Sequence, residues 1–236
     1  MKTGTIDYRD GELNLRGFLT YDERVSGKRP GVLVMPEAFG LGDHARQSAE
    51  RLAELGYVAL AGDPYGDGFL AKDLEEAMGL AMPLRDDPPR FRQRARAALD
   101  TLAALPQVDA SRLAVIGYCM GGSFSLELAR DGAPLKGAVS FHGALETKRP
   151  AQAGQVKAKV LVCHGADDPL VPPAAVAAFT EEMTKAGADW QLIMYGGTVH
   201  SFTNPAAGGM PGLAYNAASD KRSWQAMRDF FDEIFA

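Results

Sequence analysis

Short apolar runs recur along the chain and alternate with longer amphipathic stretches. Several runs have the length of a strand and little internal alternation: residues 31–36, 57–63, 112–118, 136–142, 159–165 and 190–196. Continuous apolar character over so short a length is typical of strands that are covered on both faces of a parallel sheet. The pattern therefore predicts an α/β fold built on a mostly parallel, twisted sheet.

The first part of the chain has a different pattern, in which apolar and polar positions alternate. The alternation extends over residues 4–21, on both sides of the pair Asp10 and Gly11. An Asp-Gly pair between two alternating segments is the signal of a β-hairpin with a tight turn. We therefore expect the chain to open with an antiparallel hairpin.

The stretches between the apolar runs have helical periodicity. One helix is expected to begin at Asp43, a favourable N-cap, and to stop before Gly56, a favourable residue just after a helix. Further helices are expected at 88–105, 121–130, 172–186 and 219–235. Helices that connect parallel strands cover both faces of the sheet, which completes the expected architecture.

The expected helix at 88–105 carries a cluster of arginines. Its apolar residues form one stripe, and four arginines fall outside that stripe: Arg90, Arg92, Arg94 and Arg96. They could form an anion site, but a solvated helix face is the preferred interpretation.

No repeat, low-complexity tract or linker interrupts the sequence, so residues 1–236 are expected to form a single domain. The short interval between the strands at 136–142 and 159–165 leaves little room for a separate cap domain. The segment 66–89 is the expected lid over any site.

Composition narrows the classes of partner. The chain has 236 residues, with 25 basic and 30 acidic side chains and a net charge of −5. Its basic residues do not cluster into a tract that could bind along the phosphate backbone of a nucleic acid. Nucleic acid is therefore not an expected partner. The start, "MKTGTIDYRD", has no apolar signal region, and no apolar run approaches the roughly 20 residues needed to span a bilayer. We expect a cytoplasmic protein without a membrane partner and with a small-molecule ligand; the sequence does not indicate an oligomeric state.

A cysteine lies between glycines at residues 117–122, "GYCMGG". The segment follows an expected strand and precedes an expected helix, which is the order of a nucleophile elbow with cysteine in place of serine. Cys119 would lie at a helix N-terminus, where the dipole stabilises a thiolate and the N–H of Met120 is free to bind an oxyanion. The alternative is a buried apolar cysteine beside a glycine-rich turn.

A thiol nucleophile needs a base, and the base needs an acid to orient it. His200 lies in a loop just past the final apolar strand, where a base is expected. The acid should lie between the cysteine and this histidine, and "HGADDPLVP" offers Asp167 and Asp168. The other histidines have structural interpretations: His44 as a surface residue, His142 as a pocket or packing residue, and His164 as a strand-end residue.

The three motifs "GYCMGG", "HGADDPLVP" and "YGGTVHSF", in this order, resemble those of the dienelactone hydrolase family of α/β-hydrolases. The resemblance covers nearly the whole chain and implies an α/β-hydrolase fold with a cysteine nucleophile. By this resemblance Cys119 is the nucleophile, His200 is the general base and then the general acid, and Asp168 holds the imidazole. Asp168 is preferred because it fits the family pattern G-x-x-D-x-x-V, while Asp167 is the competing acid. No cofactor is implied, and the dispersed histidines give no metal-binding spacing.

The segment "MPEAFGL" at 35–41 extends the resemblance. It implies that Glu37 lies beside the thiol and keeps it protonated until a substrate binds, since a nearby carboxylate disfavours a thiolate. A buried structural carboxylate is the alternative. The N–H of Ala38 is expected to be the second oxyanion donor, with that of Met120.

The substrate is expected to be a neutral, activated ester or lactone, with phosphotriesters as a promiscuous addition. Relatives that act on carboxymethylene butenolides hold the substrate carboxylate with arginines, one of them shortly after the catalytic histidine. Here Asn204 stands near that place, and the expected lid contributes only Arg85. The expected substrate contacts are Phe39, Met78, Met82, Tyr118 and Phe202. A true dienelactone hydrolase that acts on an anionic lactone is the alternative.

Two other classes compete with a hydrolase. A thiol redox protein usually needs a resolving cysteine, and the second cysteine, Cys163, lies within an apolar strand where it looks inert. A catalytically silent protein that binds a ligand in the same pocket is the third class. The complete set of cysteine, aspartate and histidine favours the hydrolase.

Overall fold

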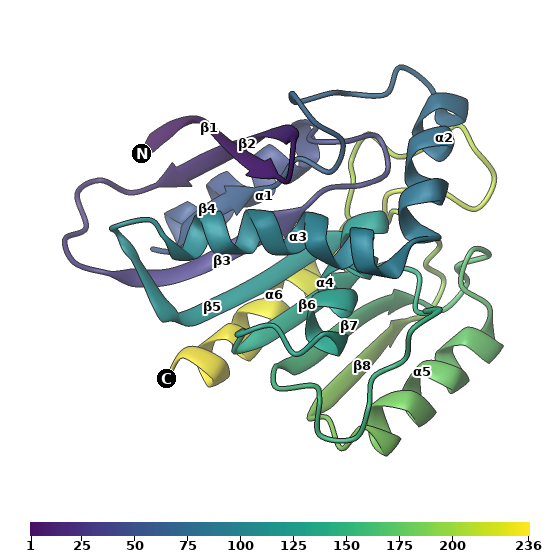
Figure 1. Ribbon diagram of the computed structural model, residues 1–236. Coiled ribbons are helices and arrows are strands. Elements are labelled where there is room, and N and C mark those ends of the chain that lie inside the picture. Colours follow the sequence, from purple (N-terminus) through teal and green to yellow (C-terminus); the bar gives the residue numbers. More distant parts are fainter.

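A computed structural model describes residues 1–236 and contains one eight-stranded sheet flanked by helices (Figure 1). The strands are β1 (Lys2–Asp10), β2 (Leu13–Tyr21), β3 (Arg29–Met35), β4 (Val58–Ala61), β5 (Val108–Tyr118), β6 (Gly137–Phe141), β7 (Lys159–Gly165) and β8 (Trp190–Tyr195). Their order in the sheet is β1-β2-β4-β3-β5-β6-β7-β8. All strands from β3 onward run parallel, whereas β2 pairs antiparallel with both β1 and β4.

The helices cover both faces of this sheet (Figure 1). They are α1 (Asp43–Glu54), α2 (Leu74–Arg85), α3 (Pro88–Ala103), α4 (Met120–Arg130), α5 (Pro173–Lys185) and α6 (Ala217–Phe235). Apolar residues of α3, α4 and α5 form one core with one face of the sheet, and those of α1 and α6 form a second core with the other face. Within β3, Leu33 belongs to the first core and Val34 to the second, which explains why the buried parts of the parallel strands are continuously apolar.

The predicted fold class is confirmed, including the antiparallel opening. The hairpin turns at Gly11, which has a positive φ of 58° that suits glycine. Each predicted parallel strand and helix is present, with ends that differ from the prediction by a few residues. No helix is long and apolar enough to cross a membrane.

The arginine-rich helix α3 differs from the prediction of a solvated face. Arg90 is exposed, but Arg92 and Arg94 are each only 4% exposed. Arg92 forms an ion pair with Glu127 of α4 at 2.7 Å, and Arg94 forms one with Asp10 of β1 at 2.7 Å. The prediction was wrong for these two residues because their acidic partners lie on other elements, which helical periodicity alone does not reveal.

Candidate active site

The turn between β5 and α4 has the geometry of a nucleophile elbow. Cys119 has φ 54° and ψ −115°, a strained conformation for a residue with a side chain, and α4 begins at the next residue. A Cβ on Gly117 would collide with the carbonyl of Gly121, and a Cβ on Gly121 would collide with the carbonyl of Met35. The glycines therefore let strand, turn and helix approach closely enough to present the partly exposed Cys119 thiol.

The loops after β7 and β8 bring a carboxylate and an imidazole together. Nδ1 of His200 lies 2.8 Å from Oδ2 of Asp168, and both side chains are almost fully buried. Oδ1 of Asp168 also accepts the backbone N–H of Leu170 at 2.9 Å, which fixes the orientation of the carboxylate. Asp167, the competing acid, is exposed, and the carboxylate bound to His200 is that of Asp168.

The other ring nitrogen of His200, Nε2, is buried and has no hydrogen-bond partner in the protein. Burial alone would lower the pKa of His200, but its hydrogen bond to Asp168 and the proximity of Cys119 raise it to about 10. An imidazolium at this position stabilises a thiolate on the neighbouring sulfur. The arrangement can therefore activate Cys119 as a nucleophile.

Two cavities, each of about 240 Å³, meet at this pair of residues. Both are lined by Cys119, His200, Ala38, Met78 and Leu170. The first, which we call the α4 arm, continues between α2 and the start of α4 and is also lined by Met82, Arg85, Met120 and Ser123. The second, the loop arm, continues between α2 and the loop 201–213 and is also lined by Glu37, Phe39, Leu74, Asn204, Met210 and Leu213. The expected lid segment 66–89 contributes α2, which forms a wall of both arms.

Two backbone N–H groups are placed to bind an oxyanion. Met120 is the first residue of α4, and its N–H has no partner within the helix. The N–H of Ala38 donates no hydrogen bond to the protein, and both residues line the α4 arm beside Cys119. The hydroxyl of Tyr65 donates to the carbonyl of Ala38 at 2.6 Å and so holds this loop in place. Burial raises the pKa of Tyr65, which keeps this donor protonated.

Glu37 lies in the loop arm and is held by two side chains. Nδ2 of Asn204 donates to both carboxylate oxygens, at 2.9 and 3.2 Å. Nδ1 of His44 lies 3.6 Å from Oε1 of Glu37. His44 was predicted to be a surface residue, but its side chain is only 14% exposed and its ring packs against Tyr118.

His142 links the cysteine turn to the histidine loop, a role that the sequence did not indicate. Its Nδ1 accepts the backbone N–H of Cys119 at 3.1 Å, and its Nε2 lies 2.7 Å from Oγ1 of Thr203. Its ring packs edge-on against His200, with centroids 5.1 Å apart. Complete burial lowers the pKa of His142 well below its usual value, so the ring is neutral and its free Nδ1 can accept.

The expected substrate contacts divide into two groups. Phe39, Met78 and Met82 line the arms. Tyr118 and Phe202 line neither arm, because both lie in the core on the α1 and α6 face of the sheet, at 2% and 0% exposure. The prediction that these two contact substrate is therefore corrected: each neighbours a catalytic candidate in sequence, but its side chain points into the opposite layer.

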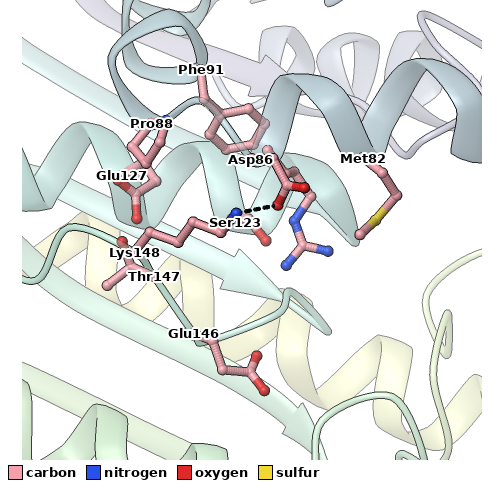
Figure 2. A pocket seen from close by; sticks show the side chains of 10 residues that line it. Met82, Asp86, Pro88, Phe91, Ser123, Glu127, Glu146, Thr147 and Lys148 are labelled. Atoms are coloured by element: carbon pink, nitrogen blue, oxygen red, sulfur yellow. Dashed lines mark hydrogen bonds and ion pairs between the residues drawn. The ribbon is translucent and has the colours of Figure 1, made fainter.

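The α4 arm leads into a polar pocket of about 180 Å³, shown in Figure 2. The two cavities share Met82, Arg85 and Ser123. Figure 2 shows Lys148 reaching across the pocket to Asp86, with Nζ and Oδ1 2.7 Å apart. Arg85 forms no ion pair, so the α4 arm ends beside an unpaired cation.

The remaining cysteine, histidine and acidic side chains do not form a second site. No three histidine, cysteine, aspartate or glutamate side chains gather into a group that could hold a metal ion. Burial raises the pKa of Cys163 to about 12, and its sulfur accepts a weak hydrogen bond from Tyr195. His164 is buried, and burial lowers its pKa.

The chain is similar in sequence and in structure to several known proteins. The dienelactone hydrolase family matches residues 15–235. A solved structure called m3DLH is 51% identical, with a TM-score of 0.95 over 100% of this chain and 99% of that one. A dienelactone hydrolase-like promiscuous phosphotriesterase from metagenomic libraries is 47% identical, with a TM-score of 0.94 over 99% of this chain and 98% of that one. An uncharacterized protein of Caenorhabditis elegans, K02A2.1, is 36% identical over 156 residues, which span 62% of this chain and 96% of that protein.

Proposed function

This chain belongs to the dienelactone hydrolase family, and from that premise we propose that it cleaves neutral, activated esters or lactones with a Cys119, His200 and Asp168 triad. Members of the family are hydrolases that act on lactones and esters, and this chain is an enzyme of that kind. The observation that carries the finer proposal is the placement of His200. One of its nitrogens is bound to Asp168, and the other is buried without a partner beside the thiol.

In the proposed reaction, the thiol proton of Cys119 passes to Nε2 of His200 and the sulfur attacks the ester carbonyl. The negative charge that develops on the carbonyl oxygen is stabilised by the N–H groups of Ala38 and Met120. The bond to the leaving oxygen then breaks as His200 protonates it, which leaves a thioester on Cys119. His200 next takes a proton from water, the resulting hydroxide attacks the thioester, and the acid is released as the thiol is restored.

Turnover of p-nitrophenyl acetate tests this function against its alternatives. A hydrolase is expected to release many equivalents of p-nitrophenol, because water regenerates the thiol after each cycle. A thiol redox protein or a silent binding protein would show no turnover. Release that stops after one equivalent would contradict the proposed deacylation step.

We propose that Glu37 restrains the thiol, so that Glu37→Gln is expected to make Cys119 react at lower pH. The carboxylate and the sulfur share the loop arm, and removing a negative charge beside a thiol favours the thiolate. The midpoint of iodoacetamide labelling against pH should therefore fall. Glu50→Gln on the exposed side of α1 is the matched control. Identical profiles for the two variants would leave Glu37 without a role in thiol control.

The charges around the two arms support a neutral acyl group. Glu37 is negative and lies in the loop arm, where the amide of Asn204 is already bound to it, so a carboxylate there would meet like charge. One observation favours the alternative, an anionic lactone: the unpaired Arg85 lines the α4 arm. Charge-assisted hydrogen bonds to such a cation are worth about 1.5 to 3 kcal/mol.

A matched pair of substrates separates these possibilities. We expect kcat/KM to be higher for a neutral aryl ester than for its analogue with a carboxylate on the acyl side. A preference for the carboxylate analogue would instead support the anionic lactone. Paraoxon extends the comparison to phosphotriesters, because the same N–H groups can hold a phosphoryl oxygen and a solved relative is described as a promiscuous phosphotriesterase. Multiple turnovers are expected, and a single stoichiometric burst would contradict this extension.

A further inference from the structure

The two arms that meet at Cys119 differ in the character of their outer ends. The α4 arm leads to the charged pocket of Figure 2, where Lys148 and Asp86 are paired and Arg85 is free. Near the thiol both arms are apolar, because Met78 and Leu170 line both of them. Beyond these shared residues the loop arm stays apolar, with Phe39, Leu74, Met210 and Leu213 in its lining. Apart from Cys119, His200 and Ser201, its polar side chains are those of Glu37 and Asn204, which are hydrogen-bonded to each other.

Apolar surface continues outward from the loop arm. Phe39, Leu74, Met78 and Leu170 are all exposed, although they also line the cavity. The segment that carries Phe69 and Leu70, both also exposed, is attached beside Phe39, because the N–H of Ala71 donates to the carbonyl of Phe39 at 3.0 Å. A single exposed leucine is ordinary, but a run of apolar side chains that leads into a cavity marks a binding site. We call this run, Phe39, Phe69, Leu70, Leu74, Met78 and Leu170, the apolar strip.

We propose that the loop arm and the apolar strip bind a hydrocarbon chain of the ester substrate, so that the preferred substrates are lipophilic esters. This inference rests on the proposed function, because it needs an ester carbonyl at Cys119. The continuity of the apolar surface identifies the occupant, because four residues of the strip line the same cavity as Cys119 and His200 and are also exposed at the surface. A second copy of the chain seated on the strip would cover the mouth of the same cavity.

The α4 arm determines how such a substrate is oriented in the site. A chain in the loop arm places the other part of the ester in the α4 arm, toward Arg85 and the polar pocket. Burial of each methylene group from water contributes about 0.8 kcal/mol, which corresponds to about fourfold in kcat/KM when the arm holds it fully. The gain should end when the chain extends beyond the strip into water.

The test is the dependence of kcat/KM on chain length. p-Nitrophenyl esters from acetate to octanoate place the chain on the acyl side, and n-alkyl acetates place it on the alcohol side. We expect kcat/KM to rise by up to about fourfold per methylene in one of the two series. Leu74→Gln and Met210→Gln are expected to lower the ratio of long-chain to acetate activity by about tenfold, because both side chains line the arm.

Matched controls remove exposed apolar side chains elsewhere. Leu55→Gln, just after α1, and Met194→Gln on β8 alter residues outside both arms and should retain the wild-type ratio. A flat chain-length dependence, or a rise that survives Leu74→Gln and Met210→Gln, would overturn the proposal even while acetate is hydrolysed. The strip would instead be a contact between copies of the chain if the wild type sedimented as a dimer and Leu74→Gln as a monomer. In that case the ratio of long-chain to acetate activity would be the same in both. Failure of the wild type to turn over acetate would contradict the proposed function itself.

Discussion

Cys119→Ala is expected to lower kcat/KM for a neutral ester by several powers of ten while the fold persists. The sulfur is the only atom that the substitution removes, and loss of a nucleophile of this kind typically costs about 10⁶-fold in rate. Alanine keeps the Cβ, so it adds no strain to the positive φ at this position. Initial rates with p-nitrophenyl acetate, together with the melting temperature, measure the two expectations separately.

Cys163→Ala is the matched control for this experiment. Cys163 lies within β7, is fully buried and has its pKa raised to about 12, so it supplies no thiolate at neutral pH. Its replacement should leave the chemistry nearly unchanged. If Cys119→Ala kept more than a tenth of the wild-type activity, Cys119 would not be the nucleophile.

The second large effect is expected from Asp168→Asn, which should lower kcat by about 10³- to 10⁴-fold. An amide at this position can donate a proton to Nδ1 of His200, which favours the wrong tautomer, and it no longer stabilises the imidazolium. The carboxylate that is removed lies 2.8 Å from that nitrogen and contributes to the raised pKa of His200. The limb of the kcat against pH profile that reports His200 should therefore move to lower pH.

The neighbouring Asp167 provides a control with the same chemical change. Its side chain is exposed and is not the one bound to His200, so Asp167→Asn should retain nearly full activity. The two variants together separate the role of the acid from a general change of charge in this loop. Equal losses in both would show that the hydrogen bond between Asp168 and His200 is not the feature that matters.

The fold could be predicted from sequence largely because the interior parallel strands are buried on both faces. Adjacent residues of β3, such as Leu33 and Val34, belong to different cores, so the run from Val32 to Met35 is apolar without a break and is easily recognised. The hairpin was equally clear, since Asp10 and Gly11 require a particular turn. The site residues stood out for a related reason: they follow the ends of such strands, where a polar residue after an apolar run is conspicuous.

The remaining features depend on side-chain orientations and on contacts between elements, which the sequence pattern does not reveal. Tyr118 adjoins the nucleophile in sequence, yet its side chain points into the core beneath the sheet. His142 contacts Cys119 across 23 positions of sequence, and Tyr65 holds the carbonyl of Ala38 across 27. Buried Arg92 looked solvated because its partner Glu127 lies on another helix. Each of these facts is set by packing between elements rather than by periodicity within one.

The position of β8 in the sheet has a consequence for how the enzyme loses activity. Cys119 follows β5, which has neighbours on both sides, whereas His200 follows β8, an edge strand in which only Tyr195 is buried. Edge elements with few buried contacts open at a lower free energy than the strands inside a sheet. Local opening of β8 is therefore expected to displace His200, the proposed general base, while Cys119 stays in place. We therefore expect inactivation by heat or denaturant to begin with local unfolding at β8, before the interior strands of the sheet unfold cooperatively.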